Sequence, residues 1–143
     1  MKIVSQNKKA RHNYEILDTY TAGIALEGWE VKTARVNAID ISNSYCSIYK
    51  GEIWWKDSFF NSYMLQKNDE YRDRKLLMNK KEILKIKNIC EAKNTTIVPL
   101  KLFFNNKNYL KLEIGIAKGL KKYDKRDKII KEENQKYLKK YII

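Results

Sequence analysis

Residues 95–117 have the sequence TTIVPLKLFFNNKNYLKLEIGIA, and this stretch decides the fold. Apolar side chains alternate with other residues in two runs, at Val98, Leu100, Leu102 and Phe104 and then at Leu110, Leu112, Ile114 and Ile116. Alternation of this kind is typical of a β-strand that buries one face. The Asn-rich residues 105–108 between the runs favour a turn. The stretch therefore predicts a long antiparallel hairpin, which needs a partner surface to bury its apolar face.

Length and charge limit the class of protein. A chain of 143 residues is expected to form one domain that buries about two-thirds of its unfolded surface on folding. Its 30 basic and 17 acidic side chains give a formal charge of +13, which favours a polyanionic partner, either nucleic acid or an anionic membrane face. A lysine-rich chain also carries lysines that are only solvated, so their placement matters more than their total.

The cysteines and the hydropathy pattern argue against several other classes. Cys46 and Cys90 lie far apart, and neither belongs to a Cys-x-x-Cys or Cys/His cluster, so we expect free thiols rather than a disulfide or a metal site. The sequence has neither a charged-then-apolar leader nor a run of about 20 apolar residues. We therefore expect a soluble cytoplasmic protein without a metal or cofactor.

The N-terminal residues are basic and contain the single histidine. The basic side chains of residues 1–11 are Lys2, Lys8, Lys9 and Arg11. Without an acidic residue among them, this segment is interpreted either as a basic arm that packs late or as a frayed terminus. Residues 12–19 place Tyr14 and Ile16 in alternation, which predicts a first strand. His12 has no second histidine near it in sequence and no evident acid–base partner, so a hydrogen-bonding or stacking role is favoured over general base catalysis.

Residues 25–36, ALEGWEVKTARV, fit a short helix, although Gly28 lowers the helix propensity by about 1 kcal/mol. Gly28, Val31 and Arg35 share one helical face, and Lys32 falls to one side of it. If Val31 faces the core, Lys32 and Arg35 flank it and can reach a phosphate with their stems laid over apolar surface. The alternative is that both side chains are simply solvated.

A second hairpin is predicted at residues 45–49 and 52–56, because Lys50-Gly51 between them places Gly where a positive φ is needed. Its aromatic residues Tyr49, Trp54 and Trp55 either pack in the core, which is the commoner arrangement in strands, or form a platform on which bases stack. Residues 61–71 are polar and irregular, which predicts a loop.

A longer helix is predicted over residues 80–92, after the basic stretch RDRK at 72–75. The Asn79 side chain can accept a hydrogen bond from the first exposed amides, and Glu82 can reach back to the cap. Ile83, Ile86 and Cys90 recur on one face, which we expect to be buried.

These elements predict a mainly β fold with added helices, a small OB-fold-like β-barrel. Closure into a barrel removes the exposed edges of the hairpins. Residues 119–143 then form a basic C-terminal tail, with nine basic and four acidic residues and a thin apolar stripe. We expect this tail to be disordered alone and helical on a partner. The stripe is narrower than a membrane-surface helix requires, which favours RNA as that partner.

Several short motifs of the sequence resemble those of a known family. They are NKKARHNY at 7–14, GWEVK at 28–32, SNSY at 42–45, RDRKLL at 72–77, AKG at 117–119 and YDKR at 123–126. In this order and spacing they closely resemble the small protein B family, the SsrA- or tmRNA-binding proteins of bacteria. The resemblance runs over nearly the whole chain, and the motifs together are highly specific.

The resemblance implies a role in ribosome rescue by trans-translation. It implies a barrel at residues 1–118 that binds the tRNA-like domain of tmRNA and delivers it to stalled ribosomes. It also implies a tail, residues 119–143, that becomes helical in the empty mRNA channel near the decoding region of the small subunit. The protein is expected to be a monomer that is not an enzyme, with no catalytic residues, small-molecule substrate or membrane partner.

By the same resemblance, specific residues are assigned to each partner. The residues expected on or supporting the RNA face are Asn7, Lys8, Arg11, His12, Tyr14, Lys32, Arg35, Leu77 and Lys118. The residues expected to engage the ribosome are Tyr123, Asp124, Lys125, Arg126, Lys128 and Lys131. Recognition of a structured RNA by phosphate contacts and base stacking needs such side chains and no catalytic constellation.

The chain departs from this family at Thr21, where the family usually has Glu. The departure implies that a polar contact near the RNA face is lost or is supplied elsewhere. Two other functions remain open from the residues alone. One is a ribosomal or single-strand RNA-binding protein on the same barrel without a rescue role. The other is an RNA-cleaving enzyme that uses His12, which is disfavoured because no matched acid or base accompanies it.

Overall fold

The computed structural model describes residues 1–62 and 68–119. The helices are α1 (Lys8–Asn13), α2 (Gly28–Arg35) and α3 (Lys80–Lys93). The strands are β1 (Lys2–Gln6), β2 (Tyr14–Ile24), β3 (Ile39–Asp40), β4 (Tyr45–Tyr49), β5 (Glu52–Lys56), β6 (Phe59–Phe60), β7 (Arg74–Leu77), β8 (Thr96–Phe104) and β9 (Leu110–Gly119). The tail expected at 119–143 lies outside the described residues from 120 onward.

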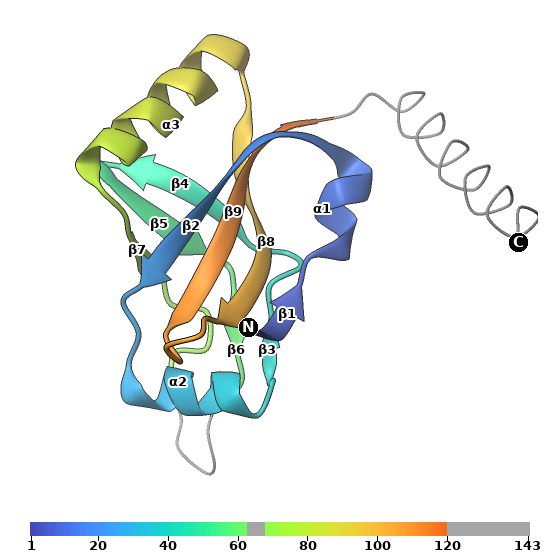
Figure 1. Cartoon of the computed structure of the whole chain (residues 1–143), viewed down its shortest axis with the longest axis vertical. Coiled ribbons are helices and arrows are strands. Elements are labelled where there is room, and N and C mark those ends of the chain that lie inside the picture. Colours follow the sequence, from blue (N-terminus) through green and yellow to red (C-terminus); the bar gives the residue numbers. More distant parts are fainter. Residues whose placement is uncertain (63–67, 120–143) are drawn as a thin grey trace, which may run out of the picture.

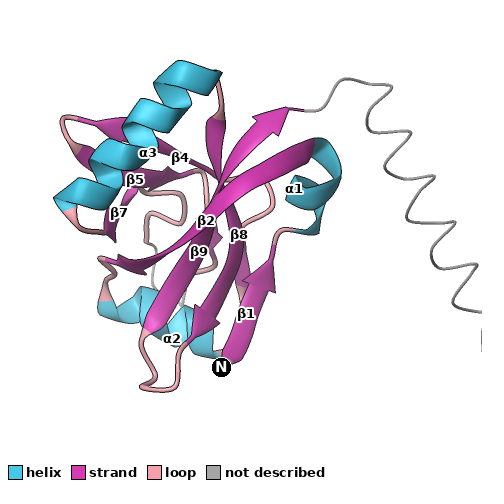
Figure 2. Ribbon diagram, turned by 45° about the horizontal axis from the view of Figure 1, so that its top comes forward, coloured by secondary structure: helices cyan, strands magenta, loops and turns pink. Residues whose placement is uncertain are grey.

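Antiparallel strands close into a ring. Their order is β8-β4-β5-β7-β2-β9, and the pairing of β9 with β8 completes the circle. β1 continues the sheet beyond β8, and β3 pairs with β6 as a small separate ribbon. Figure 1 shows α2 below one end of the ring and α3 beside β4, β5 and β7, an arrangement also visible in Figure 2. The predicted small barrel, mainly β with added helices, is confirmed.

The predicted hairpin of β8 and β9 forms one wall of this barrel. Leu102 of β8 and Leu112 of β9 lie opposite each other and are fully buried in the main core. Ile114 and Ile116 continue the buried row along β9. Burial of each such side chain contributes roughly 1.5 to 3 kcal/mol relative to leaving it exposed, so the hairpin is held mainly by its inner face.

One part of the hairpin pattern differs from the prediction of a single apolar face. A β-bulge between Pro99 and Lys101 shifts the register of β8. Val98 and Leu100 consequently face outward, where they form a second small core with Ala10 of α1. A bulge places two residues of one strand opposite one residue of its partner, so it changes which side each following residue occupies.

The N-terminal segment is ordered, which corrects the predictions of a loose basic arm and of a strand beginning at 12. β1 pairs with β8, and α1 packs Ala10 against the outward side chains of that strand. Asn7 caps α1, because its Oδ1 accepts from the Ala10 amide at 3.2 Å. His12 therefore lies in the last turn of α1, and β2 starts at Tyr14.

Helix α2 is present, but the side that it buries differs from the prediction. Glu30, Thr33 and Ala34 are its buried residues, while Val31 is only half-buried. The prediction failed because it assumed an apolar contact face, whereas Glu30 is buried through ion pairs. Lys32 is exposed on the opposite side of the helix, as the sequence pattern allowed.

The second hairpin is confirmed, with positive φ at both turn residues, 51° at Lys50 and 75° at Gly51. Its aromatic side chains divide between two faces because successive residues of a strand point to opposite sides. Trp55 is fully buried, and its Nε1 donates to Ser44 Oγ at 2.9 Å. The neighbouring Trp54 is half-buried on the other face, so Tyr49, Trp54 and Trp55 do not form one stacking platform.

Helix α3 begins after Asn79 and buries Ile83 and Ile86 as predicted, while Cys90 on the same face is only half-buried. The proposed cap is wrong in its detail, because the Asn79 side chain makes no capping hydrogen bond. The helix ends at Asn94, which adopts a left-handed conformation with φ of 51°. Asn is one of the residues that tolerate this conformation, so Asn94 itself favours the end of the helix at this point.

Candidate nucleic-acid interface

The barrel carries a surface of mixed charged and apolar side chains on the outward side of β8, β9 and β2. We call it the outer sheet face, and its residues are Lys101, Phe103, Lys111, Glu113, Thr21, Gly23 and, from β7, Leu77. The strand register arranges them in two rows. One row runs from Lys101 through Glu113 to Thr21, and the other runs from Phe103 through Lys111 and Gly23 to Leu77. Directly opposite residues of paired strands have Cβ atoms about 4.5 to 5.5 Å apart, so successive side chains of a row lie within reach of one another.

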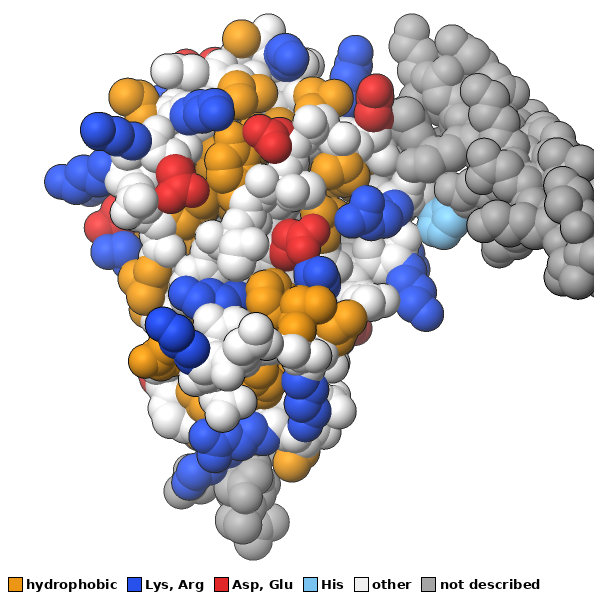
Figure 3. Space-filling model, viewed as in Figure 1, with side chains coloured by type: hydrophobic (Ala, Val, Ile, Leu, Met, Phe, Trp, Pro, Cys, Tyr) orange, Lys and Arg blue, Asp and Glu red, His pale blue; other side chains and the backbone are white. Residues whose placement is uncertain are grey.

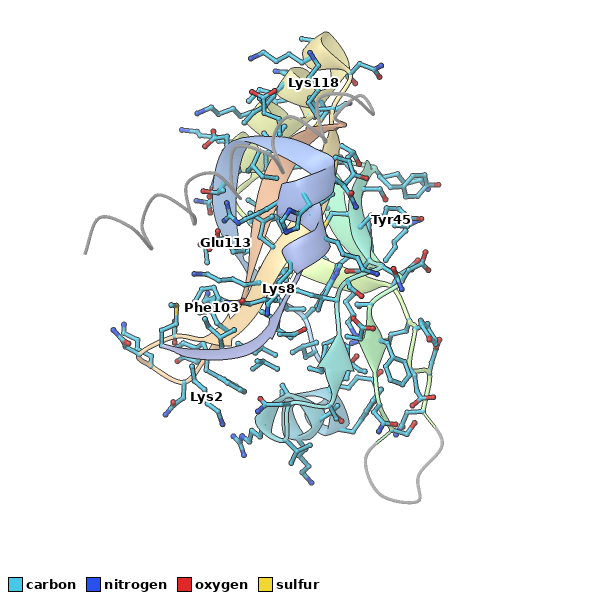
Figure 4. All side chains as sticks on the ribbon, turned by 90° about the vertical axis from the view of Figure 1, so that its right-hand side faces the viewer. Lys2, Lys8, Tyr45, Phe103, Glu113 and Lys118 are labelled. Atoms are coloured by element: carbon cyan, nitrogen blue, oxygen red, sulfur yellow. The ribbon has the colours of Figure 1, made fainter. Side chains whose placement is uncertain are left out.

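Helix α1 borders the outer sheet face with basic side chains. Lys8, Arg11 and His12 are all exposed on it. A hollow of about 210 Å³ lies at the junction of the helix and the sheet, and Lys8, Arg11, Lys101 and Glu113 are among the residues that line it. Figure 4 shows Lys8, Glu113 and Phe103 on this side of the barrel, away from Tyr45. The structure therefore brings two of the expected RNA-binding residues, Lys8 and Arg11, together with side chains of the sheet.

Asn7 belongs to the same region but is buried. Its Nδ2 donates to the Pro99 carbonyl at 3.0 Å, and its backbone amide donates to the Leu100 carbonyl at 2.8 Å. Together with the cap on Ala10, these bonds fix the start of α1 against β8. Asn7 therefore supports the basic helix and does not present its own amide to a ligand.

Leu77 stands at the other border of the outer sheet face and is 53 % exposed. It lies opposite Gly23, where an added Cβ would come within 3.3 Å of the Leu77 Cβ and 3.6 Å of the Lys111 Nζ. The missing side chain at Gly23 thus leaves room for Leu77 and Lys111 to meet over bare backbone. A groove of about 420 Å³ runs from Thr21 past Leu77 to the start of α3.

The remaining expected residues divide between two places. Tyr14 packs half-buried on the small core beneath α1, and Lys118 lies exposed near the end of β9. Lys32 and Arg35 lie instead on α2, at one end of the barrel. Arg35 lines a separate hollow of about 570 Å³ with Lys2 and the 105–108 turn. The sequence-based set therefore does not form one continuous surface.

The position of α2 depends on a buried ionic cluster. The Glu30 carboxylate accepts from the guanidinium groups of both Arg72 and Arg74, and Glu30 and Arg74 are fully buried. Arg74 also donates to the Ser58 carbonyl at 3.1 Å and stacks over Phe60 at 3.9 Å from the ring centre. Burial lowers the pKa of the Arg74 guanidinium, and the adjacent Glu30 carboxylate opposes that shift. This basic residue is therefore structural.

Three residues of the outer sheet face were missed when candidates were chosen from the sequence. They are Lys101, Lys111 and Glu113. Lys111 and Glu113 alternate with Leu110, Leu112 and Ile114, so the period of the strand already placed them on the solvent side. Figure 3 shows that basic side chains are spread around acidic ones on the side where β2 and β9 face the viewer.

Potential metal ligands are scattered in the described part of the chain. Within residues 1–62 and 68–119, no three His, Cys, Asp or Glu side chains gather as metal ligands. Both cysteines are free, and burial raises the pKa of the Cys46 thiol. None of the helices in this part of the chain is long and apolar enough to cross a membrane. The expected ribosome-binding residues, Tyr123, Asp124, Lys125, Arg126, Lys128 and Lys131, lie outside the described residues.

Comparisons with known proteins agree on one family. Residues 4–142 match the family model described as SmpB protein. The chain is 54 % identical over 142 residues to an SsrA-binding protein of Mycoplasmopsis synoviae, and the match covers 99 % of each chain. It is 48 % identical to an SsrA-binding protein of Mycoplasmopsis fermentans, over 99 % of this chain and 97 % of that protein.

A solved structure agrees as well. It carries the description "tmRNA-SmpB: a journey to the center of the bacterial ribosome". It superposes with a TM-score of 0.69 at 37 % sequence identity, covering 87 % of this chain and 92 % of the solved one.

Proposed function

The chain belongs to the SmpB protein family, and from this premise we propose that it is an RNA-binding protein of trans-translation. It binds the tRNA-like domain of tmRNA and delivers that RNA to ribosomes that have stalled. Its relatives carry the name SsrA-binding protein, and the solved structure that it resembles is described by tmRNA and the bacterial ribosome. We place the protein in the cytoplasm, where its partners act.

The observation that carries the proposal is that α1 lies beside the outer sheet face. Lys8 and Arg11 on the helix and Lys101 on the sheet line one hollow, and Lys111 lies in the neighbouring row of the sheet. Ammonium and guanidinium groups bind phosphates, and such contacts supply most of the affinity for RNA. Exposed Leu77 at the border provides an apolar surface against which an unstacked base can pack.

Within this proposal the expected residues take different roles. Lys8, Arg11, His12 and Lys118 contact RNA, and Leu77 packs against it. Asn7 and Tyr14 hold α1 in place and so act through their neighbours. Lys32 and Arg35 contact RNA that extends past the end of the barrel. The protein performs no covalent chemistry, because positioning an RNA on a ribosome requires none.

We further propose that residues 1–118 bind the RNA and that residues 119–143 act on the ribosome. In this division the C-terminal residues Tyr123, Asp124, Lys125, Arg126, Lys128 and Lys131 contact ribosomal RNA along the vacant mRNA channel. Removing residues 120–143 should leave the affinity for tmRNA nearly intact while abolishing the tagging of proteins on stalled ribosomes. Equal loss of both activities would contradict the division.

A binding competition tests the function itself. The full chain is titrated with the tRNA-like domain of tmRNA and with an RNA duplex of equal length, at several salt concentrations. We expect tighter binding of the tRNA-like domain and a steep loss of affinity as salt rises, because bound cations displace counterions from RNA. Equal affinity for both RNAs would favour the alternative of a general RNA-binding protein without a rescue role. A flat response to salt would contradict phosphate contact as the main source of affinity.

A further inference from the structure

We propose that Glu113, held by Lys101, recognises the amino edge of an unpaired guanine in the bound RNA. The inference rests on the proposed function, since it names what the outer sheet face reads within that RNA. In this arrangement the Glu113 carboxylate, which lies among phosphate-binding cations, discriminates between bases.

Glu113 occupies the middle of the outer sheet face. On β9 it lies opposite Lys101 of β8 on one side and opposite Thr21 of β2 on the other. Its Oε2 is 3.3 Å from the Lys101 Nζ, and the Glu113 and Lys101 side chains are 20 % and 27 % exposed. It also lines the hollow beneath α1, together with Lys8 and Arg11. The carboxylate is therefore half-buried, fixed by its partner and open to a ligand held by these cations.

A carboxylate in this position is unfavourable for phosphate binding alone, because it repels each phosphate that approaches Lys8 or Arg11. An ionised carboxylate only accepts hydrogen bonds, so its partner on RNA must donate. Guanine presents N1–H and N2–H₂ side by side, which matches the two carboxylate oxygens. Proteins read unpaired RNA bases through such edges. Lys101 holds one oxygen of Glu113, which leaves the other oxygen and the remaining lone pairs for the base.

The register of β2 and β9 places Thr21 beside Glu113. Thr21 and Glu113 are directly opposite, and their side chains project from the same face. A carboxylate placed at position 21 would therefore lie in the same row of the outer sheet face as one at position 113. This arrangement predicts that either strand can carry the carboxylate, which provides a rescue experiment.

The first test is the variant Glu113→Gln in the full chain, measured against the tRNA-like domain and against a plain RNA duplex. We expect about tenfold weaker binding of the tRNA-like domain, since a hydrogen bond to a charged group contributes on that order. Binding of the duplex should stay unchanged or become tighter, because a negative charge has been removed. Glu91→Gln, on exposed α3, removes the same charge and serves as the control. The proposal would be overturned if Glu113→Gln bound the tRNA-like domain as tightly as the parent protein does, or more tightly.

The second test moves the carboxylate across the strand pair. Glu113→Thr alone should weaken binding of the tRNA-like domain about tenfold, and the double variant Thr21→Glu/Glu113→Thr should recover most of that loss. Urea unfolding of each variant confirms that affinity is compared between folded proteins. A double variant that binds no better than Glu113→Thr would contradict the role of the carboxylate at this place.

The third test identifies the base. Inosine in place of the unpaired guanines removes N2–H₂, and deoxyguanosine at the same sites removes the 2′-hydroxyl. Inosine should weaken binding of the parent protein but should add no loss for Glu113→Gln, because the partner is already missing. Fully additive losses, or a loss seen only with deoxyguanosine, would overturn the assignment to guanine. The parent's preference for the tRNA-like domain tests the proposed function separately and does not depend on these variants.

Discussion

Replacing Glu30 by glutamine is expected to destabilise the barrel by about 4 kcal/mol. The carboxylate is fully buried and accepts from both Arg72 and Arg74. A glutamine of the same shape has one oxygen and one NH₂ group, so one guanidinium would face a donor instead of an acceptor. Arg74 is itself fully buried and would keep its charge without a counterion. Breaking a buried pair in this way costs about 3 to 5 kcal/mol.

Urea unfolding followed by circular dichroism measures this effect. With a slope of about 2 kcal/mol per molar urea, the midpoint should fall by roughly 2 M. The matched control is Glu52→Gln, which breaks a pair with Lys75 on the same strand as Arg74. The Glu52 and Lys75 side chains are 45 % and 41 % exposed, and exposed pairs contribute about 0 to 1 kcal/mol. Equal midpoints for the Glu30 and Glu52 variants would refute the reasoning.

A double-mutant cycle identifies the source of the loss. Arg74→Met removes the buried cation, and the combined variant Glu30→Gln/Arg74→Met should cost at least about 1 kcal/mol less than the sum of the single changes. Additive losses would mean that Glu30 and Arg74 stabilise the protein independently, which would contradict an energetically coupled buried pair.

Three other expectations concern the barrel. Gly51→Ala should destabilise the protein by about 1 kcal/mol in urea unfolding, since a φ of 75° is strained for a residue with a Cβ; an unchanged midpoint would contradict this. Maleimide should label half-buried Cys90 faster than buried Cys46, whose thiol pKa is raised by burial, and labelling at equal rates would argue against that burial. Hydrogen bonds from the amide and hydroxyl of Ser42 lower the pKa of Asp40 below its ordinary 3.8, so this carboxylate should stabilise the fold above pH 3.8 and lose the effect as pH falls through the lower folded value. An NMR titration midpoint for Asp40 at or above 3.8 would contradict that direction.

Much of the barrel could be predicted because its strands carry local signals. The alternation in residues 95–117 and the Lys50-Gly51 turn each specify a hairpin without knowledge of the rest of the chain. Helix α3 was likewise visible from the recurrence of Ile83 and Ile86. In each case the period of the apolar residues matches the period of the element that forms.

The errors arose where distant contacts decide the structure. The ordered α1 depends on Asn7 reaching the carbonyls of β8, which no local pattern reveals. The buried side of α2 is set by Glu30, a residue that sequence reasoning places outside because it is charged. The bulge beside Pro99 moved Leu100 from the main core to the packing surface of α1.

The candidate interface was incomplete for a related reason. The resemblance supplied residues on α1 and at Leu77, but it did not show that the polar side of β8 and β9 lies between them. Lys101 comes to that side through the bulge, and only strand pairing places Glu113 beside it. The register of the strand pairs decides which basic side chains share one surface, and the sequence alone did not determine that register.

Chemical-shift mapping tests most directly whether α1 and the outer sheet face bind the RNA. Backbone amides of the full chain are followed by NMR while the tRNA-like domain of tmRNA is added. We expect the largest changes at Lys8, Lys101, Lys111 and Glu113, and small changes at Tyr49 on the exposed side of the β4–β5 hairpin. Changes centred on that hairpin, with the outer sheet face and α1 unaffected, would contradict this placement of the RNA.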